Sequence, residues 1–358
     1  MVELTLPGIV EQIVRTPRLA AGVLRRPAED PVHRILFIHG NVSSAAFWQP
    51  VMLALPVDVD AFAVDLRGFG ASEPLPVDAR RGVRDFSDDV ASVIDGLGLG
   101  PVHVVGWSMG GGVAMQLLID RPELVRSLTL ESTVSPYGFG GTATRGEPCT
   151  ADGAGTGGGG ANPDFVARLA AGDRTEDAAT SPLAVFRSSY VAPGYESGDE
   201  PIWLEAMLTT VTGVDNYPGD SVPSENWPGF AAGSRGVLNT MAPTHFDTTA
   251  IVAVEPKPPV LWIRGTADAI VNDASFFDLN QLGKAGIIEG WPGEDEAPPQ
   301  PMLAQTRAIL DEYATRGGSV TEVALPGCGH SPHLERPDEF LGALRLLLGA
   351  ADDARESS

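Results

Sequence analysis

Short apolar segments alternate along this chain with segments in which apolar residues recur every three or four positions. Runs of aliphatic and β-branched residues predict buried strands at 34–38, 61–65, 102–105, 125–130, 259–263 and 318–325, with two weaker runs at 8–14 and 19–24. Helical spacing of apolar residues occurs at 46–55, 85–97, 113–119 and 337–348. This alternation predicts an α/β protein with a doubly wound, mostly parallel sheet of about eight strands.

The alternation stops at Thr133 and is restored only near Pro259. The intervening segment begins with a glycine-rich stretch at 137–160. Candidate helices then begin at Asn162 and Ser181, because each is a capping residue followed directly by proline. This pattern predicts a helical unit separate from the sheet.

The rhythm of strands and helices is intact on both sides of that segment. We therefore expect residues 1–132 and 255–358 to form the two parts of one core, and residues 133–254 to form a large helical cap inserted between them. A smaller irregular insert is expected at 280–301.

Composition limits the class of protein. The 358 residues carry a net charge of −23, with an isoelectric point near 4.5, which opposes binding to nucleic acids and to anionic lipid surfaces. No apolar run approaches the ~18 residues of a membrane span, and the first residues lack the basic and apolar regions of a secretory signal. The spacing of Cys149 and Cys328 indicates neither a metal site nor a disulfide framework. We expect a cytoplasmic protein, and its oligomeric state stays open.

The candidate chemistry centres on Ser108, in the sequence Gly106-Trp107-Ser108-Met109-Gly110. An apolar strand leads into this motif and a helical pattern follows it. A serine on a tight turn between strand and helix projects its hydroxyl outward, and glycines on both sides leave room for the turn. The start of the helix directs backbone N–H groups and a partial positive charge toward the same point. Ser108 is therefore the candidate nucleophile.

A serine nucleophile requires a general base, and the base requires an acid that fixes its tautomer. Among six histidines, His330 is the preferred base because it follows the last predicted strand, at the sheet edge where the nucleophile is expected. His333 is the alternative. Asp268, after the preceding strand, is the preferred acid. Glu131, at the end of the strand after the nucleophile's helix, is the alternative acid, and Asp273 is a weaker one.

Two backbone N–H groups are expected to stabilise a developing oxyanion. One belongs to Met109, directly after the nucleophile, and the other to Asn41, in the loop after the strand at 34–38. His39 precedes this loop, and we expect it to have a structural role.

Five motifs resemble those of the α/β-hydrolase superfamily, in particular its capped serine esterases and lactonases. They are HGN at 39–41, DLRGFGAS at 65–72, GWSMGG at 106–111, RGTAD at 264–268 and GCGH at 327–330. The resemblance covers the core, roughly two-thirds of the chain, and its order of serine, aspartate and histidine is that of the superfamily. Some relatives take the acid from the strand end near Glu131. Alignment on the turn before that strand brings Ser132 to that position, so Asp268 stays preferred.

The HGN motif, followed by two serines and Trp48, also resembles haloalkane dehalogenases, as does Trp107. Those enzymes carry an aspartate nucleophile where this chain has Ser108. A serine cannot form their ester intermediate from an alkyl halide, so we exclude dehalogenation and, for the same reason, epoxide hydrolysis.

These features predict hydrolysis of a carboxylic ester or lactone through an acyl-enzyme, without a metal or organic cofactor. The cleft under the cap should bind a neutral, hydrophobic small molecule, because the insertion contains few cations. A bulky lactone is a special case. The candidate substrate-binding residues are Trp107, Trp203, Met207 and Trp227. Three alternatives stay open: acyl transfer, carbon–carbon bond hydrolysis in the same site, and a slow-turnover ligand sensor.

Overall fold

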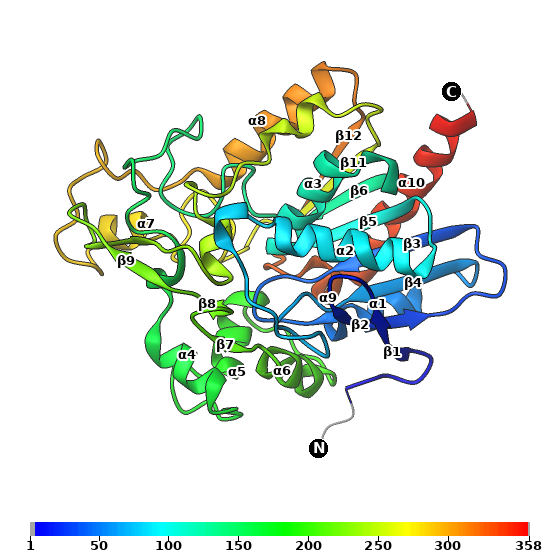
Figure 1. Ribbon diagram of the computed structural model, residues 1–358, viewed down its shortest axis with the longest axis horizontal. Coiled ribbons are helices and arrows are strands. Elements are labelled where there is room, and N and C mark those ends of the chain that lie inside the picture. Colours follow the sequence, from blue (N-terminus) through cyan, green and yellow to red (C-terminus); the bar gives the residue numbers. More distant parts are fainter. Residues whose placement is uncertain (1–3, 357–358) are drawn as a thin grey trace.

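The predicted strands form one eight-stranded sheet in the computed structural model, which describes residues 4–356 (Figure 1). Their spatial order is β1-β2-β4-β3-β5-β6-β11-β12, where β2 is antiparallel to both neighbours and all pairs from β4 to β12 are parallel. The expected mostly parallel, eight-stranded sheet is confirmed. The strands are β1 (Val10–Arg15), β2 (Ala20–Arg26), β3 (His33–Ile38), β4 (Val59–Val64), β5 (Val102–Trp107), β6 (Val125–Glu131), β11 (Val260–Gly265) and β12 (Val320–Leu325).

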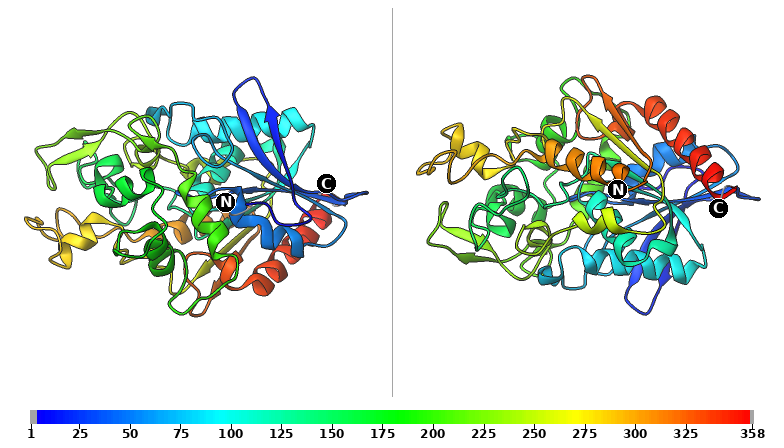
Figure 2. Two further views of the ribbon diagram at one scale, coloured as in Figure 1. Left: turned by 90° about the horizontal axis from the view of Figure 1, so that it is seen from below. Right: turned by 90° about the horizontal axis from the view of Figure 1, so that it is seen from above.

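Helices cover both faces of the sheet, which explains why its central strands are continuously apolar. Every residue of β4 and β5 is buried. Helices α2 and α3 pack together on one face, and α1 and α10 lie on the other (Figure 2). The core helices are α1 (Gln49–Ala54), α2 (Arg84–Leu97), α3 (Met109–Asp120), α8 (Met302–Thr315), α9 (Pro332–Glu335) and α10 (Pro337–Glu356). None of the helices within residues 4–356 is long and apolar enough to cross a membrane.

A long insertion leaves the sheet after β6 and returns at β11. Its helices are α4 (Pro163–Ala170), α5 (Pro182–Val185) and α6 (Glu200–Leu208). The Asn162 side chain caps α4 as expected, since it accepts from the backbone N–H groups of Asp164 and Phe165. Helix α5 also begins where expected, with Ser181 at its N-cap and Pro182 at its first position, although the Ser181 side chain makes no capping hydrogen bond.

The insertion is less helical than its sequence pattern predicts. Two two-stranded sheets form in it, which were not expected: β7 (Thr212–Gly213) with β8 (Tyr217–Pro218), and β9 (Ser221–Pro223) with β10 (Phe230–Ala232). Outside it, α7 (Leu279–Lys284) lies in the segment expected to be irregular, and α8 was not predicted.

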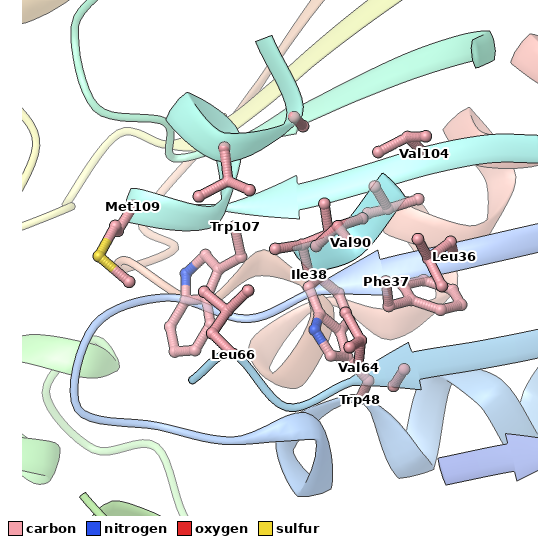
Figure 3. Close-up of a cluster of buried hydrophobic side chains, with 14 of the residues drawn as sticks. Leu36, Phe37, Ile38, Trp48, Val64, Leu66, Val90, Val104, Trp107 and Met109 are labelled. Carbon is pink, nitrogen blue, oxygen red and sulfur yellow. The ribbon is translucent and has the colours of Figure 1, made fainter. Parts of the chain in front are cut away.

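The insertion shares the hydrophobic core of the sheet. Helix α6 packs on the short 3-10 helix η1 (Ala45–Trp48), and the Trp203 ring stacks on Phe186, with centroids 5.6 Å apart. The centroid of the Phe47 ring, in the core, lies 6.3 Å from that of Trp203 and 5.3 Å from that of Trp107. Figure 3 shows part of this core near the end of β5, including Trp107. The insertion is therefore attached at the carboxyl ends of the parallel strands, where loops from β3, β5, β11 and β12 meet.

Candidate active site

Ser108 occupies a sharp turn between β5 and α3. Its backbone has φ 57° and ψ −121°, a conformation that is strained for a residue with a side chain. The Ser108 N–H donates to the carbonyl of Glu131 (2.9 Å), which fixes the turn to the neighbouring strand. A Cβ at Gly106 would collide with the Gly110 backbone, and a Cβ at Gly110 would collide with the His39 carbonyl. The two glycines of the motif are thus required for close packing of the turn.

His330 and Asp268 form a buried pair at the same sheet edge. The imidazole Nδ1 lies 2.9 Å and 3.0 Å from the two carboxylate oxygens. Asp268 Oδ1 also accepts from the backbone N–H groups of Ile270 (2.8 Å) and Val271 (3.0 Å), so the carboxylate is held in place. A proton on Nδ1 that is donated to Asp268 leaves the His330 Nε2 lone pair available as a base.

The alternative candidates are placed elsewhere. Glu131 pairs with His333 instead of His330: its Oε1 accepts from the His333 backbone N–H (2.7 Å) and lies 2.9 Å from Nδ1. Both side chains of this second pair are fully buried. Asp273 accepts from the backbone N–H groups of Leu303 and Ala304 at the start of α8. The structure therefore brings Asp268, and neither Glu131 nor Asp273, to His330.

The loop after β3 holds the second expected oxyanion donor. The Gly40 carbonyl lies 2.7 Å from His39 Nδ1 and accepts from the Ser43 hydroxyl at 2.8 Å. The Leu66 N–H donates to His39 Nε2 (3.0 Å), so the neutral imidazole carries its proton on Nδ1. Burial lowers the pKa of His39 to about 4, which keeps the ring neutral. Because Gly40 and Asn41 share one peptide plane, these bonds orient the Asn41 N–H.

A cavity of about 450 Å³ joins these groups beneath the insertion. Ser108 and His330 both line it, as do Asn41 and Met109, although no hydrogen bond joins the serine hydroxyl to the imidazole within the described chain. Among residues 4–356, His330 is the one acidic or basic side chain that lines the cavity. Most of its wall is aliphatic, aromatic or glycine, including Phe139, Gly140, Gly160, Phe165, Leu238, Met241 and Ile270.

Of the residues expected to contact substrate, Trp107 lines this cavity and three others do not. Trp203 and Met207 are fully buried between the insertion and the core. Trp227 lies against the segment that contains α7, where its Nε1 donates to the Glu289 carbonyl (2.8 Å). Phe276 and Phe277, in the loop after β11, line the cavity but were not expected, because no periodic pattern marks such loop residues.

The strand order and the serine turn, together with the buried carboxylate–imidazole pair, are those of an α/β hydrolase. Residues 35–343 match the alpha/beta hydrolase family, and the chain belongs to that family. Its relatives include esterases, carbon–carbon bond hydrolases and carbamate hydrolases.

Individual relatives differ in how much of the chain they match. Over 283 residues the chain is 25% identical to 2-(acetamidomethylene)succinate hydrolase of Mesorhizobium japonicum, covering 77% of this chain and 87% of that protein. A 112-residue segment is 39% identical to the dihydrolipoyllysine-residue acetyltransferase component of the acetoin cleaving system of Cupriavidus necator, covering 31% of this chain but only 29% of that protein. A carboxylesterase from Bacillus subtilis shares the fold, with a TM-score of 0.56 at 18% identity over 95% of this chain and 91% of its own.

Proposed function

We propose that this hydrolase cleaves a carboxylic ester of a neutral, hydrophobic small molecule through an acyl-enzyme on Ser108. The observation that carries the proposal is a cavity lined by Ser108 and by His330, which is paired with Asp268, while no other ionisable acidic or basic side chain of the described residues lines it. The serine and imidazole supply nucleophile and base, and the uncharged wall sets the substrate class.

The proposed reaction has two half-reactions. His330 Nε2 takes the proton of the Ser108 hydroxyl as Oγ attacks the ester carbonyl, and the N–H groups of Asn41 and Met109 donate to the oxyanion. The imidazolium then gives its proton to the departing alkoxide, which leaves as the alcohol. In the second half-reaction His330 takes a proton from water as the water oxygen attacks the acyl-enzyme carbonyl. The bond to Ser108 Oγ then breaks, the carboxylic acid leaves, and the imidazolium returns its proton to Oγ. Asp268 keeps the imidazole oriented throughout.

Charge in the insertion supports a neutral substrate. Of its five arginines, four are already engaged in ion pairs with carboxylates: Arg168 with Asp164 and Asp173, Arg174 with Glu205, Arg187 with Glu176 and Glu200, and Arg235 with Asp215. Arg145 is exposed and does not line the cavity. A carboxylate substrate would lose its hydration there without meeting a cation, which costs several kcal/mol. The proposed neutral substrate therefore differs from that of 2-(acetamidomethylene)succinate hydrolase, the relative whose name specifies a succinate.

A fluorophosphonate probe and a panel of neutral p-nitrophenyl esters test the proposal. Wild type should be labelled covalently and should hydrolyse the esters, whereas Ser108→Ala should lose labelling and about 10⁴-fold or more of kcat. The alanine variant should unfold near the wild-type temperature, because the hydroxyl makes no hydrogen bond in the described part of the chain. Near-normal turnover by Ser108→Ala would refute the proposal. Adding an alcohol or a diketone to the panel tests acyl transfer and carbon–carbon bond hydrolysis.

A further inference from the structure

Tyr190, which ends the π-helical turn η5 (Phe186–Tyr190) of the insertion, contacts the loops of two expected catalytic groups. Its hydroxyl donates to the Asn41 carbonyl (2.8 Å) and lies 3.3 Å from the Val42 carbonyl. Its own backbone carbonyl accepts from the Ser331 hydroxyl at 2.6 Å. Ser331 directly follows His330. One residue of the cap therefore touches both the loop of the expected oxyanion donor and the loop of the expected base.

The backbone beneath the Tyr190 hydroxyl is strained. Val42 has φ 46°, in the left-handed region that a β-branched residue rarely adopts. Such a conformation persists only where surrounding contacts hold it. The phenol reaches the carbonyl on each side of the Val42 Cα, so it is placed to hold this conformation. The Asn41 N–H, one peptide earlier in the chain, depends on the same loop geometry.

The phenol is suited to this role because it stays protonated. The Tyr190 side chain is buried, and burial raises its pKa, so the hydroxyl remains a donor throughout the working range of the enzyme. The aromatic ring forms part of the cavity wall, with its centroid 6.2 Å from that of His330.

A second contact ties the same cap segment to the histidine loop. The Glu335 carboxylate accepts from the backbone N–H of Ala192 at 2.8 Å and from that of Gly329 at 3.0 Å. Gly329 precedes His330, and a Cβ there would collide with the Ala192 backbone. The cap segment at 190–192 is thus packed directly against the histidine loop.

We propose that Tyr190 is a positioning residue for the hydrolytic reaction: its hydroxyl holds the oxyanion loop, and its carbonyl holds the loop of His330. This inference rests on the proposed function. The cap then contributes to the rate of the chemical step as well as to the choice of substrate, because removing the hydroxyl releases the Asn41 loop without opening the cavity.

Tyr190→Phe tests this inference, and Tyr195→Phe is the matched control. Tyr195 is also a cap tyrosine whose hydroxyl donates to a core carbonyl, that of Leu334 (3.2 Å), but this bond reaches neither the oxyanion loop nor the loop residues beside His330. With a neutral p-nitrophenyl ester, Tyr190→Phe should lower kcat about 10-fold and leave KM within about twofold, since the lost contact acts on the transition state. Affinity for an alkyl boronic acid, which forms a tetrahedral adduct, should fall by about the same factor. Tyr195→Phe should keep both values near wild type.

Three results would overturn the inference: wild-type kcat in Tyr190→Phe, an equal loss in both variants, or a raised KM with unchanged kcat. Equal losses would mean that only general attachment of the cap matters, and thermal unfolding of both variants measures that attachment. Failure of the proposed function looks different, because wild type itself would then neither hydrolyse the esters nor react with the fluorophosphonate.

Discussion

The His333 imidazole lies 2.9 Å from the Glu131 carboxylate, the same distance that separates His330 from Asp268. Two acid–imidazole pairs therefore lie at one edge of the sheet, close to Trp107, whose ring centroid is 5.0 Å from that of His333 and 5.5 Å from that of His330. Of the two imidazoles, the cavity is lined by His330. The geometry thus assigns different expected roles to two pairs of similar chemistry.

Replacing each acid distinguishes these roles. Asp268→Asn should lower kcat by about 10³- to 10⁴-fold, because an amide at this position favours the wrong imidazole tautomer. Glu131→Gln should keep kcat within about 10-fold but lower the free energy of unfolding by about 1–3 kcal/mol, since its NH₂ would be buried where Glu131 Oε2 now has no partner. Ester kinetics and urea unfolding measure the two effects. A larger loss of kcat in Glu131→Gln than in Asp268→Asn would indicate that Glu131, at the end of β6, is the acid.

The burial of His39 predicts a dependence of stability on pH. Its pKa is near 6.5 when unfolded and about 4 in the fold, so between these values the unfolded chain binds the extra proton. The contribution of His39 to stability is therefore complete above pH 6.5 and is lost as the pH falls to 4. The free energy of unfolding should decrease by roughly 3 kcal/mol over this range from this residue.

The non-titrating variant His39→Gln isolates this contribution. The unfolding free energy of wild type minus that of the variant should decrease from pH 7 to pH 4. Asp65, whose burial raises its pKa to about 6, acts in the opposite direction, but it is present in both proteins and cancels in the difference. Parallel pH profiles for the two proteins would contradict a buried, neutral His39.

The uncharged cavity predicts selectivity against anionic substrates. In a matched series with one leaving group, neutral esters should have a kcat/KM at least about 10-fold above those with a terminal carboxylate, because no cation offsets the desolvation of the anion. Each buried methylene of a neutral acyl chain should add to kcat/KM, at about 0.8 kcal/mol per group, until the cavity is filled. A consistent preference for the carboxylate esters would refute this reading.

Gly160 allows the size of the cavity to be tested. It lines the wall, and a Cβ there would meet no atom closer than Leu279 Cδ1 at 3.9 Å, so a side chain would extend into free space. Gly160→Leu should reduce kcat/KM for bulky esters by about 10-fold or more while sparing acetate esters. Gly198→Leu, at an exposed glycine away from the cavity, is the control. Equal losses for acetate and bulky esters would show damage to the fold instead.

The core could be predicted from sequence because its signals are local. The strands are continuous apolar runs, the Ser108 turn carries its glycines, and Asp268 and His330 each follow a strand whose carboxyl end must meet the others at one edge. Asp268 lies beside His330, and the order of the motifs had favoured Asp268 over Glu131 as the partner of this histidine.

The substrate wall could not be predicted in the same way. Trp203 is as aromatic as any ligand contact, yet α6 turns it toward Phe186 and Phe47. The wall instead includes several glycines and the loop residues Phe276 and Phe277, whose positions depend on tertiary packing. The role proposed for Tyr190 could not be predicted, because it depends on carbonyl groups that lie about 150 residues away along the chain.

The Glu335 carboxylate has a consequence for how molecules enter and leave. Because it joins Ala192 of the cap to Gly329 of the core, the cap cannot swing away as a rigid lid without breaking these bonds. Exposed side chains nevertheless occur in the cavity wall. They include Asn162 and Ser188 from the insertion, and Phe276, which is 58% exposed. We expect substrate and product to pass beside these exposed side chains, whose rotation takes picoseconds to nanoseconds, so that product release does not depend on slow opening of the cap.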